Sequence, residues 1–316
     1  MGRHAFLFPG QGSQAVGMGR DLAAAFRAAR EVFQEVDDTL SQRLSKLMFE
    51  GPAEELTLTA NAQPALMAVS LAVLRVLTRE GGLRLEDQAV FLAGHSLGEY
   101  SALTAAGVFD LATAARLLRV RGDAMQAAVP PGLGAMAALL GVSFDDAVAI
   151  CAEAEAGEVV QPANDNGGGQ VVISGHAGAV DRAIELAKAR GFRRAMKLPV
   201  SAPFHCALMQ NAAVAMAAAL AEVGFAAPCV PVVANVSAAA ETDPARLRDL
   251  LVAQVTGTVR WRESMEMMAG AGVESFVELG AGKVLSGLTR RLLPEARAVS
   301  VGNPAEIEAL LTQLQA

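Results

Sequence analysis

The sequence predicts an α/β protein in which a parallel-sheet main domain carries a small inserted domain. Short apolar runs alternate with helical patterns up to about residue 130 and again from residue 199, which is typical of a parallel sheet covered by helices on both faces. Residues 131–198 instead follow the order strand, helix, strand, strand, helix, strand, which is typical of a ferredoxin-like module. With 316 residues, of which 53% are hydrophobic, the chain is long enough to bury both cores.

The first part of the main domain begins with the apolar run Ala5–Phe8, which predicts a strand that ends in a glycine loop. Apolar residues then recur at helical spacing from Leu22 to Leu40, and this pattern predicts one helix. Further helices are expected over Asn61–Leu77 and Leu111–Ala128, with a fully buried strand at Ala89–Ala93 between them.

The inserted domain is expected to form one four-stranded sheet with two helices on one face. Its expected strands are Ala135–Val142, Val159–Ala163, Gln170–Ser174 and Arg194–Leu198, and its expected helices are Phe144–Ala156 and Ala177–Arg190. In the rest of the main domain, helices are expected at 206–223, 244–256 and 262–271, strands at 230–235 and 275–279, and helices at the C-terminal end.

Composition and charge exclude several classes of protein. The formal net charge of −7 and the pI near 5.2 argue against nucleic acid as the main partner, because phosphate binding needs a concentrated basic surface. No apolar run reaches the ~18 residues of a membrane span, and the run Ala65–Leu77 contains Arg75. The N-terminal apolar run is too short for a signal peptide, so we expect the cytoplasm. Three widely spaced cysteines favour neither a disulfide framework nor a metal site, and we expect no metal.

The segment Gly94-His95-Ser96-Leu97-Gly98 follows the buried strand and matches the Gly-x-Ser-x-Gly nucleophile elbow. Ser96 is therefore a candidate nucleophile. The helix-compatible residues that follow would place it at a helix N-terminus, where backbone N–H groups stabilise an oxyanion. The alternative is a simple Gly/Ser turn between a strand and a helix.

A serine nucleophile needs a general base, most often a histidine. Of the four histidines, His95 lies in the elbow and is expected to point away from Ser96. His205 follows the extended, proline-containing segment 199–204, and such a loop can present a side chain at a cleft. His205 is therefore the candidate base, against the alternative of a surface loop histidine.

The glycine loop after the first strand allows a second interpretation. Gly10-x-Gly12-x-x-Ala15 formally fits a dinucleotide fingerprint, and Glu31 lies about 20 residues further on. That acidic residue should end a second strand, yet the residues around Glu31 continue the helical pattern. A dinucleotide site is therefore disfavoured, and a plain strand-to-helix turn remains the other alternative.

Five motifs together resemble those of malonyl-CoA:acyl carrier protein transacylases in order and spacing, and the resemblance covers nearly the whole chain. The motifs are Phe8-Pro9-Gly10-Gln11-Gly12-Ser13-Gln14, Gly94-His95-Ser96-Leu97-Gly98-Glu99-Tyr100, Arg121-Gly122-x-x-Met125-Gln126, Val172-Ile173-Ser174-Gly175 and Pro199-Val200-Ser201-x-Pro203-x-His205. The resemblance implies a hydrolase-like α/β main domain over residues 1–130 and 199–316, with a ferredoxin-like insertion at 131–198.

The resemblance also implies a reaction and its residues. Malonyl would move from malonyl-CoA to the phosphopantetheine thiol of acyl carrier protein, in fatty-acid or polyketide synthesis, with no cofactor beyond the coenzyme A thioester itself. Ser96 would be the nucleophile, with His205 as its base and acid. The backbone N–H groups of Gln11 and Leu97 would form the oxyanion hole, and Arg121 would bind the free malonyl carboxylate, which suits the planar guanidinium.

Three further residues are implied as supporting ones. The main-chain carbonyl of Gln254 would orient His205, Asn164 would line the cleft, and Phe204 would crowd a branched α-carbon and so favour malonyl over methylmalonyl. The chain departs from the residues commoner in the family at the turn Asn166-Gly167-Gly168-Gly169, at Ser237 and at Thr258.

Two rival functions remain open at this point. A serine thioesterase or esterase has the same elbow, and a non-catalytic docking module for carrier proteins could have a similar fold. A basic cluster at the end of the inserted domain is a candidate docking surface for coenzyme A phosphates or an acidic carrier protein, against the alternative of a solvated strand edge. This cluster consists of Arg190, Arg193, Arg194 and Lys197.

Overall fold

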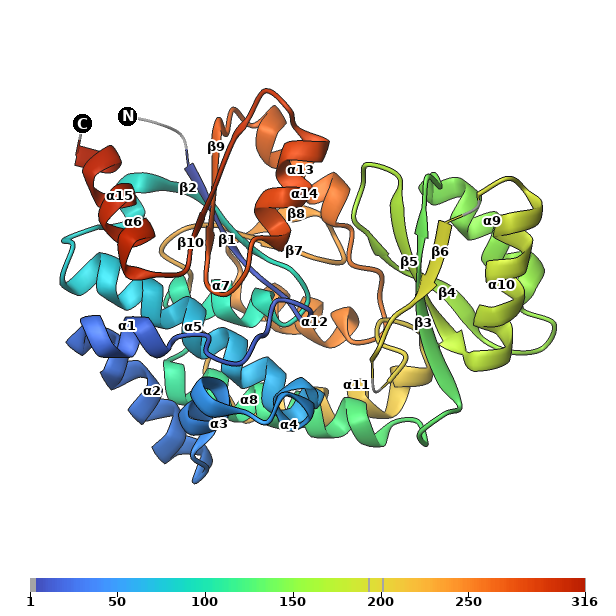
Figure 1. The fold of residues 1–316 in the computed structure, drawn as a ribbon, viewed down its shortest axis with the longest axis horizontal. Coiled ribbons are helices and arrows are strands. Elements are labelled where there is room, and N and C mark those ends of the chain that lie inside the picture. Colours follow the sequence, from blue (N-terminus) through green and yellow to red (C-terminus); the bar gives the residue numbers. More distant parts are fainter. Residues whose placement is uncertain (1–3, 193, 201, 316) are drawn as a thin grey trace.

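In the computed structural model of Figure 1, the described part of the chain forms two β-sheets, each flanked by helices. The structure describes residues 4–192, 194–200 and 202–315, so Arg193 of the basic cluster and Ser201 of the fifth motif lie outside the described residues. The strands are β1 (His4–Phe8), β2 (Ala89–Gly94), β3 (Gly134–Leu140), β4 (Val160–Asp165), β5 (Gln170–His176), β6 (Arg194–Lys197), β7 (Val232–Ala234), β8 (Ala239–Glu241), β9 (Ser275–Leu279) and β10 (Arg297–Val301).

The helices are mostly longer than the strands and precede or follow them in the chain. They are α1 (Arg20–Ala25), α2 (Arg27–Leu40), α3 (Leu44–Glu50), α4 (Ala53–Thr57), α5 (Thr59–Arg79), α6 (Leu85–Gln88), α7 (Gly98–Ala105), α8 (Leu111–Ala127), α9 (Phe144–Ala154), α10 (Ala177–Ala189), the 3-10 turn η1 (Ala207–Met209), α11 (Gln210–Ala221), α12 (Pro244–Gln254), α13 (Trp261–Gly270), α14 (Val284–Leu292) and α15 (Pro304–Gln315).

The larger sheet has the strand order β10-β9-β1-β2-β7-β8. The prediction of a parallel sheet is confirmed from β10 to β7 and is wrong at β8, which pairs antiparallel with β7. The central strand β1 pairs with β2 on one side and β9 on the other. Loops that leave neighbouring parallel strands in opposite directions open a crevice at the carboxyl ends, which is where ligands bind in such sheets.

Side chains of β1 alternate between the two faces of the larger sheet, and both faces are buried. Phe6 and Phe8 belong to the core beneath α2, α5 and α8, whereas Ala5 and Leu7 belong to the core beneath α13 and α14. This burial on both sides explains why β1 reads as a continuous apolar run rather than an alternating one.

Helix α5 is long and apolar enough to cross a membrane by length and composition. However, 89% of its most apolar 18-residue window is buried inside this fold, so α5 is a core helix. It packs against α2 and α8 below the larger sheet (Figure 1).

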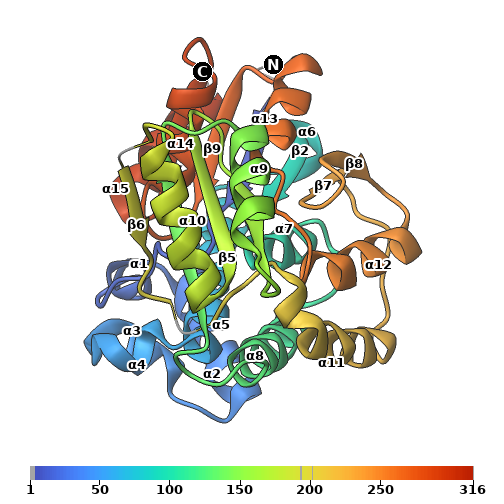
Figure 2. The same cartoon turned by 90° about the vertical axis from the view of Figure 1, so that its right-hand side faces the viewer.

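The smaller sheet has the order β4-β5-β3-β6, and each neighbouring pair is antiparallel. Figure 2 shows α9 and α10 side by side on the outer face of this sheet, where they enclose a separate core that includes Leu139, Ile150 and Ile173. The inner face carries Met136 and Val172, which belong to the core of the larger body. The smaller sheet therefore forms one wall of the space between the two bodies.

The sequence-based boundaries need several corrections. The helix expected from Leu22 to Leu40 is broken at Phe26, whose backbone is extended, so α1 and α2 are separate. The helix expected at 206–223 begins with the 3-10 turn η1. The predictions omit α3, α4, α6, β8 and β10, which are seven residues or shorter and thus too short to show a clear period.

Candidate active site

Ser96 lies in a strained turn between β2 and α7. Its backbone φ is 53°, which is uncommon for a residue other than glycine. The flanking glycines make this turn possible, since a Cβ at Gly94 would lie 1.9 Å from the carbonyl group of Gly98, and a Cβ at Gly98 would lie 2.2 Å from the carbonyl oxygen of Phe8. The geometry is that of a nucleophile elbow, in which close packing holds the serine at the sheet edge.

The hydroxyl of Ser96 and the imidazole of His205 are in hydrogen-bond contact, with 2.7 Å between Oγ and Nε2. The Nδ1 atom of His205 lies 2.9 Å from the main-chain oxygen of Gln254, so Nδ1 carries the proton and donates it to that carbonyl. Nε2 is then free to accept from the serine. Burial, together with the charge of Arg121, lowers the pKa of His205 to about 3, so the imidazole is neutral and able to act as a base.

Arg121 lies on α8 with its guanidinium buried beside the serine, and 2% of the residue is exposed. Its nitrogen atoms donate to Gln63 Oε1 at 2.7 Å, to Gln254 Oε1 at 2.9 Å and to Ser96 Oγ at 3.2 Å. These acceptors are neutral, and burial lowers the pKa of Arg121. A buried cation held by neutral groups is an apt partner for an entering carboxylate.

The glycine loop after β1 lies against the elbow, because β1 and β2 are neighbours in the sheet and Phe8 pairs with Gly94. A Cβ at Gly10 would lie 2.6 Å from the carbonyl oxygen of His95, so this approach requires glycine. Within the described part of the chain, the backbone N–H groups of Gln11 and Leu97 have no hydrogen-bond acceptor. Such free amides beside a nucleophile are suited to an oxyanion.

A cavity of about 800 Å³ lies between the two bodies and contains these groups. Its size is within the usual range for a small-molecule site. Gln254 does not line it and instead lies fully buried beneath Ser96. The remaining residues expected at the site do line it: Ser96, His205, Arg121, Gln11, Leu97, Asn164 and Phe204.

Comparisons with known proteins identify the family of this chain. Residues 5–306 match the acyl transferase domain family. The chain is 48% identical to the malonyl CoA-acyl carrier protein transacylase of Salmonella typhimurium, over 99% of this chain and 100% of that protein. It is 46% identical to the protein of that name from Bacillus subtilis, over 100% and 98% of the two chains. The chain belongs to the malonyl CoA-acyl carrier protein transacylase family.

Solved structures show the same similarity. An acyl-carrier-protein-S-malonyltransferase from Bartonella henselae superposes with a TM-score of 0.97 at 58% identity, covering 100% of both chains. A malonyl-transacylase in complex with its type II PKS acyl-carrier protein superposes with a TM-score of 0.95 at 43% identity, covering 98% of this chain and 99% of that one. The α/β architecture is therefore that of the transacylase family.

Sequence reasoning missed three polar side chains of this transacylase-family site. Gln63 contacts Arg121, Asn235 accepts from the Ser96 N–H at 2.7 Å, and Glu99 contacts both Asn235 and Gln254. A signal existed for Asn235, because it ends an apolar strand segment at the same sheet edge as Ser96. Glu99 lies within the elbow motif, but nothing in the sequence indicates that its side chain turns inward.

The smaller body contributes the segment from Asn164 to Asn166 to the transacylase-family site. The Nε2 atom of His95 lies 2.9 Å from Asn166 Oδ1, whereas the hydroxyl of Ser96 contacts His205 and Arg121. The backbone of Asn164 bridges to Val259 of the larger body. The elbow is thus supported from both bodies.

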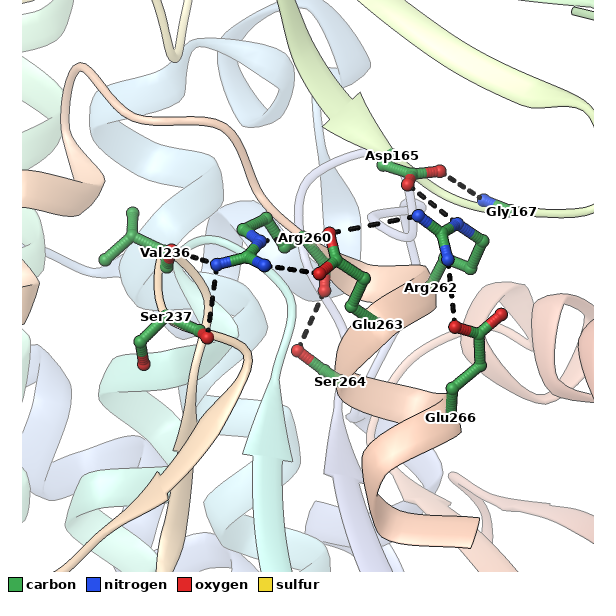
Figure 3. Close-up of polar contacts among 9 residues, drawn as sticks. All are labelled: Asp165, Gly167, Val236, Ser237, Arg260, Arg262, Glu263, Ser264 and Glu266. Carbon is green, nitrogen blue, oxygen red and sulfur yellow. Dashed lines mark hydrogen bonds and ion pairs between the residues drawn. The ribbon is translucent and has the colours of Figure 1, made fainter. Parts of the chain in front are cut away.

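Figure 3 shows the polar network that fastens this segment in place. The buried carboxylate of Asp165 accepts from Arg262 at 2.9 Å, which joins β4 to the start of α13. Arg260 donates to the main-chain oxygen atoms of Val236 and Ser237 at 3.3 and 3.2 Å. Ser237, one of the departures from the family pattern, therefore takes part through its backbone rather than its side chain.

The basic cluster is partly neutralised in this transacylase-family chain. Arg190 pairs with Glu153, and Lys197 pairs with Asp181 at 2.7 Å. Arg194 lies exposed on β6, which leads into the cavity-lining residues from Leu198 onward. Among the described members of the cluster, Arg194 is the one that takes part in neither of these ion pairs.

Proposed function

We propose that this chain transfers malonyl from malonyl-CoA to the phosphopantetheine thiol of acyl carrier protein, through a malonyl ester on Ser96. The observation that carries the proposal is the buried Arg121 guanidinium 3.2 Å from the Ser96 hydroxyl, in the same cavity as His205. The names of the relatives support the substrates, which would serve fatty-acid or polyketide synthesis.

In the first half-reaction, His205 Nε2 takes the proton of the Ser96 hydroxyl as Oγ attacks the thioester carbonyl carbon. The carbonyl oxygen becomes an oxyanion, which the N–H groups of Gln11 and Leu97 stabilise. The intermediate then collapses, the carbon–sulfur bond breaks, and the coenzyme A thiolate leaves with the proton from His205.

The second half-reaction repeats these steps with a different nucleophile. The phosphopantetheine thiol gives its proton to His205 Nε2, and the sulfur attacks the malonyl ester. The ester bond breaks, and Ser96 Oγ regains a proton from His205. One imidazole therefore serves both halves of a ping-pong reaction.

Selection of the acyl group would take place at the buried end of the cavity. Arg121 binds the free malonyl carboxylate and replaces the water that the carboxylate loses on entry. Phe204 and Asn164 line the same cavity, where Phe204 would crowd a branched α-carbon. The main-chain oxygen of Gln254 holds His205 in the tautomer that the reaction needs.

For the domain organisation, we propose a ferredoxin-like insertion at 131–198 in a hydrolase-like main domain formed by 1–130 and 199–316. The strand order β4-β5-β3-β6 with two helices on one face supports this assignment. We further expect a cytoplasmic enzyme that needs neither a metal nor a cofactor, because the transfer uses groups of the chain and of its substrates.

The test is incubation with malonyl-CoA, with and without the holo form of acyl carrier protein, followed by intact-protein mass spectrometry. We expect a malonyl adduct on Ser96 without the carrier, and malonyl on the carrier when it is present. Release of free malonate without transfer would instead identify a thioesterase, and the absence of any adduct or turnover would contradict the proposal.

A further inference from the structure

The strained peptide of Ser96 is held by side chains on both of its polar groups. Its N–H donates to Asn235 Oδ1 at 2.7 Å, and its carbonyl oxygen accepts from Gln254 Nε2 at 2.9 Å. Asn235 also donates to the carbonyl oxygen of Gly94 at 2.7 Å. These bonds oppose relaxation of a backbone with φ of 53°.

The two holding residues meet at one buried carboxyl group. The Oε2 atom of Glu99 accepts from the backbone N–H of Asn235 at 3.0 Å and from the side-chain amide of Gln254 at 2.8 Å. Glu99 lies in the first turn of α7 and is fully buried, and its backbone N–H donates to the carbonyl oxygen of Ser96 at 3.0 Å. The carboxyl group therefore lies directly beneath the nucleophile and is unused by the proposed chemistry.

Through Gln254, the carboxyl group of Glu99 is also connected to Arg121, which would bind the malonyl carboxylate, and to His205, which would activate Ser96. Gln254, which donates to Glu99, accepts from Arg121 with its side-chain oxygen and from His205 with its main-chain oxygen. A shift of the Gln254 side chain would displace the Arg121 guanidinium, because each group satisfies the other in a buried space.

Oε2 of Glu99 can accept these bonds in either charge state. Burial raises the pKa of Glu99 to about 7, against the hydrogen bonds from Gln254 and Asn235, which lower it. Within the described residues, the other oxygen, Oε1, has no hydrogen-bond partner and is free to carry the proton. The site therefore requires a hydrogen-bond acceptor where Oε2 lies, and this acceptor need not be charged.

We propose that Glu99 is a positioning residue that orients Asn235 and Gln254, and through them the Ser96 peptide and the Arg121 guanidinium. The inference rests on the proposed role of Ser96 as the malonylated nucleophile. It predicts that the orientation of the Ser96 peptide and that of the Arg121 guanidinium both depend on one hydrogen-bond acceptor, Oε2 of Glu99.

The test compares Glu99→Gln with Glu99→Ala. Glutamine can place its amide oxygen where Oε2 lies, since the opposite orientation would bring its NH₂ group against two donors. Alanine leaves the backbone N–H of Asn235 and one of the two N–H groups of the Gln254 amide buried without this acceptor, while the other still donates to Ser96. The matched control is Glu278→Ala, since Glu278 is also a fully buried carboxylate and accepts from the backbone N–H groups of Leu285 and Ser286 at 3.0 and 2.7 Å.

The measurements are the rates of serine acylation by malonyl-CoA and by acetyl-CoA, by rapid-quench intact mass, on protein whose fold is verified by circular dichroism. We expect Glu99→Gln to acylate with malonyl within about fivefold of the wild-type rate. We expect Glu99→Ala to lose roughly ten- to hundredfold and to lower the ratio of malonyl to acetyl rates. Glu278→Ala should lower stability but keep that ratio, because a reduced folded fraction affects both substrates equally.

Three results would overturn the proposal: Glu99→Gln as slow as Glu99→Ala, a folded Glu99→Ala at the wild-type rate, or an unchanged substrate ratio in Glu99→Ala. If Glu99→Ala does not fold, Glu99→Gln still decides, because a loss above tenfold in that folded variant contradicts acceptance by a neutral oxygen. A wild-type protein with no malonyl on Ser96 would instead refute the proposed function itself.

Discussion

The guanidinium of Arg121 lies 3.2 Å from the hydroxyl of Ser96, although 25 residues of chain separate them. The elbow presents the serine at the end of β2, and the arginine reaches it from the middle of α8. A carboxylate on the α-carbon side of a bound thioester would enter this contact. In the proposed reaction, this short distance couples the nucleophile Ser96 to the group that selects malonyl.

Arg121→Ala should reduce kcat/KM for malonyl-CoA strongly. Removing one partner of a desolvated charge pair costs about 2–5 kcal/mol, which corresponds to tens- to thousands-fold in kcat/KM. Acetyl-CoA lacks the carboxylate, so its kcat/KM should hold or improve. Arg119→Ala, on the same helix but bonded to Asn61, is the matched control and should keep the malonyl preference. Equal losses of kcat/KM for both substrates would instead show that Arg121 supports the fold or the cavity in general.

Ser96→Ala should abolish the covalent malonyl intermediate while the chain stays folded. The alanine keeps the elbow backbone but removes Oγ, which lies 2.7 Å from His205. Intact mass after exposure to malonyl-CoA measures the adduct, and circular dichroism verifies the fold. An adduct that survives on this variant would end the assignment of the nucleophile.

His205→Ala should slow acylation and transfer together, because in the proposed mechanism one imidazole takes and returns the proton in both half-reactions. In the wild type, the pKa of His205 lies at about 3, so the free enzyme keeps a neutral base well below pH 6. The acylation rate should show no loss from protonation of His205 between pH 8 and about pH 5. Single-turnover rates across this range provide the check, and a fall with a midpoint near 6.5 would contradict the neutral buried imidazole.

Glu99→Gln should change how stability depends on pH. The pKa of Glu99 is raised from 4.5 to about 7 in the folded chain, so the folded state binds the proton more tightly. The stability that this provides is complete below pH 4.5 and is lost as pH rises through 7. Glutamine does not titrate, so the variant lacks this loss. The free energy of unfolding of Glu99→Gln minus that of the wild type should therefore rise with pH, by up to about 1.4 kcal/mol per pH unit between pH 4.5 and 7. Urea denaturation of both proteins tests this, and parallel curves would contradict it.

Arg194→Ala should weaken binding of the carrier protein several-fold and reduce its salt dependence, because exposed charges steer an acidic partner and ions screen them. Arg190→Ala should have a smaller effect, since Arg190 already pairs with Glu153. Titrations at two ionic strengths measure both quantities. The same affinity and the same salt dependence for the wild type and both variants would show that this cluster is only a solvated strand edge.

Much of this fold could be predicted from local patterns. Strands β1 and β2 are continuous apolar runs, and the longer helices have apolar periods that hold over enough residues to be recognised. The elbow motif and the resemblance of five segments pointed to some of the residues that line the cavity, among them Ser96, His205 and Arg121. The short elements around α3 and α4 lacked such a signal.

The support beneath Ser96 could not be predicted. Glu99 contacts Asn235 and Gln254 across 136 and 155 residues, and such pairing depends on how the sheet brings distant loops together. The resemblance pointed to the main chain of Gln254 but not to its side chain, which contacts Arg121, Ser96 and Glu99. A sequence shows that a glutamine is present, whereas only the fold decides which way its amide turns.

The pairing of Phe8 with Gly94 has a consequence for how the two loops of the site could evolve. An irregularity near the start of the two strands shifts their register, because His4 pairs with Ala89 whereas Ala5 pairs with Phe91. Val90 is the extra residue, and the pairing is regular again from Ala5 and Phe91 onward, so the elbow lies opposite the glycine loop. One position along a strand is about 3.3 Å, more than the whole length of a hydrogen bond. An insertion or deletion between this irregularity and the carboxyl ends of the two strands would thus separate the amides of Gln11 and Leu97, whereas changes in the helices that follow would leave them together.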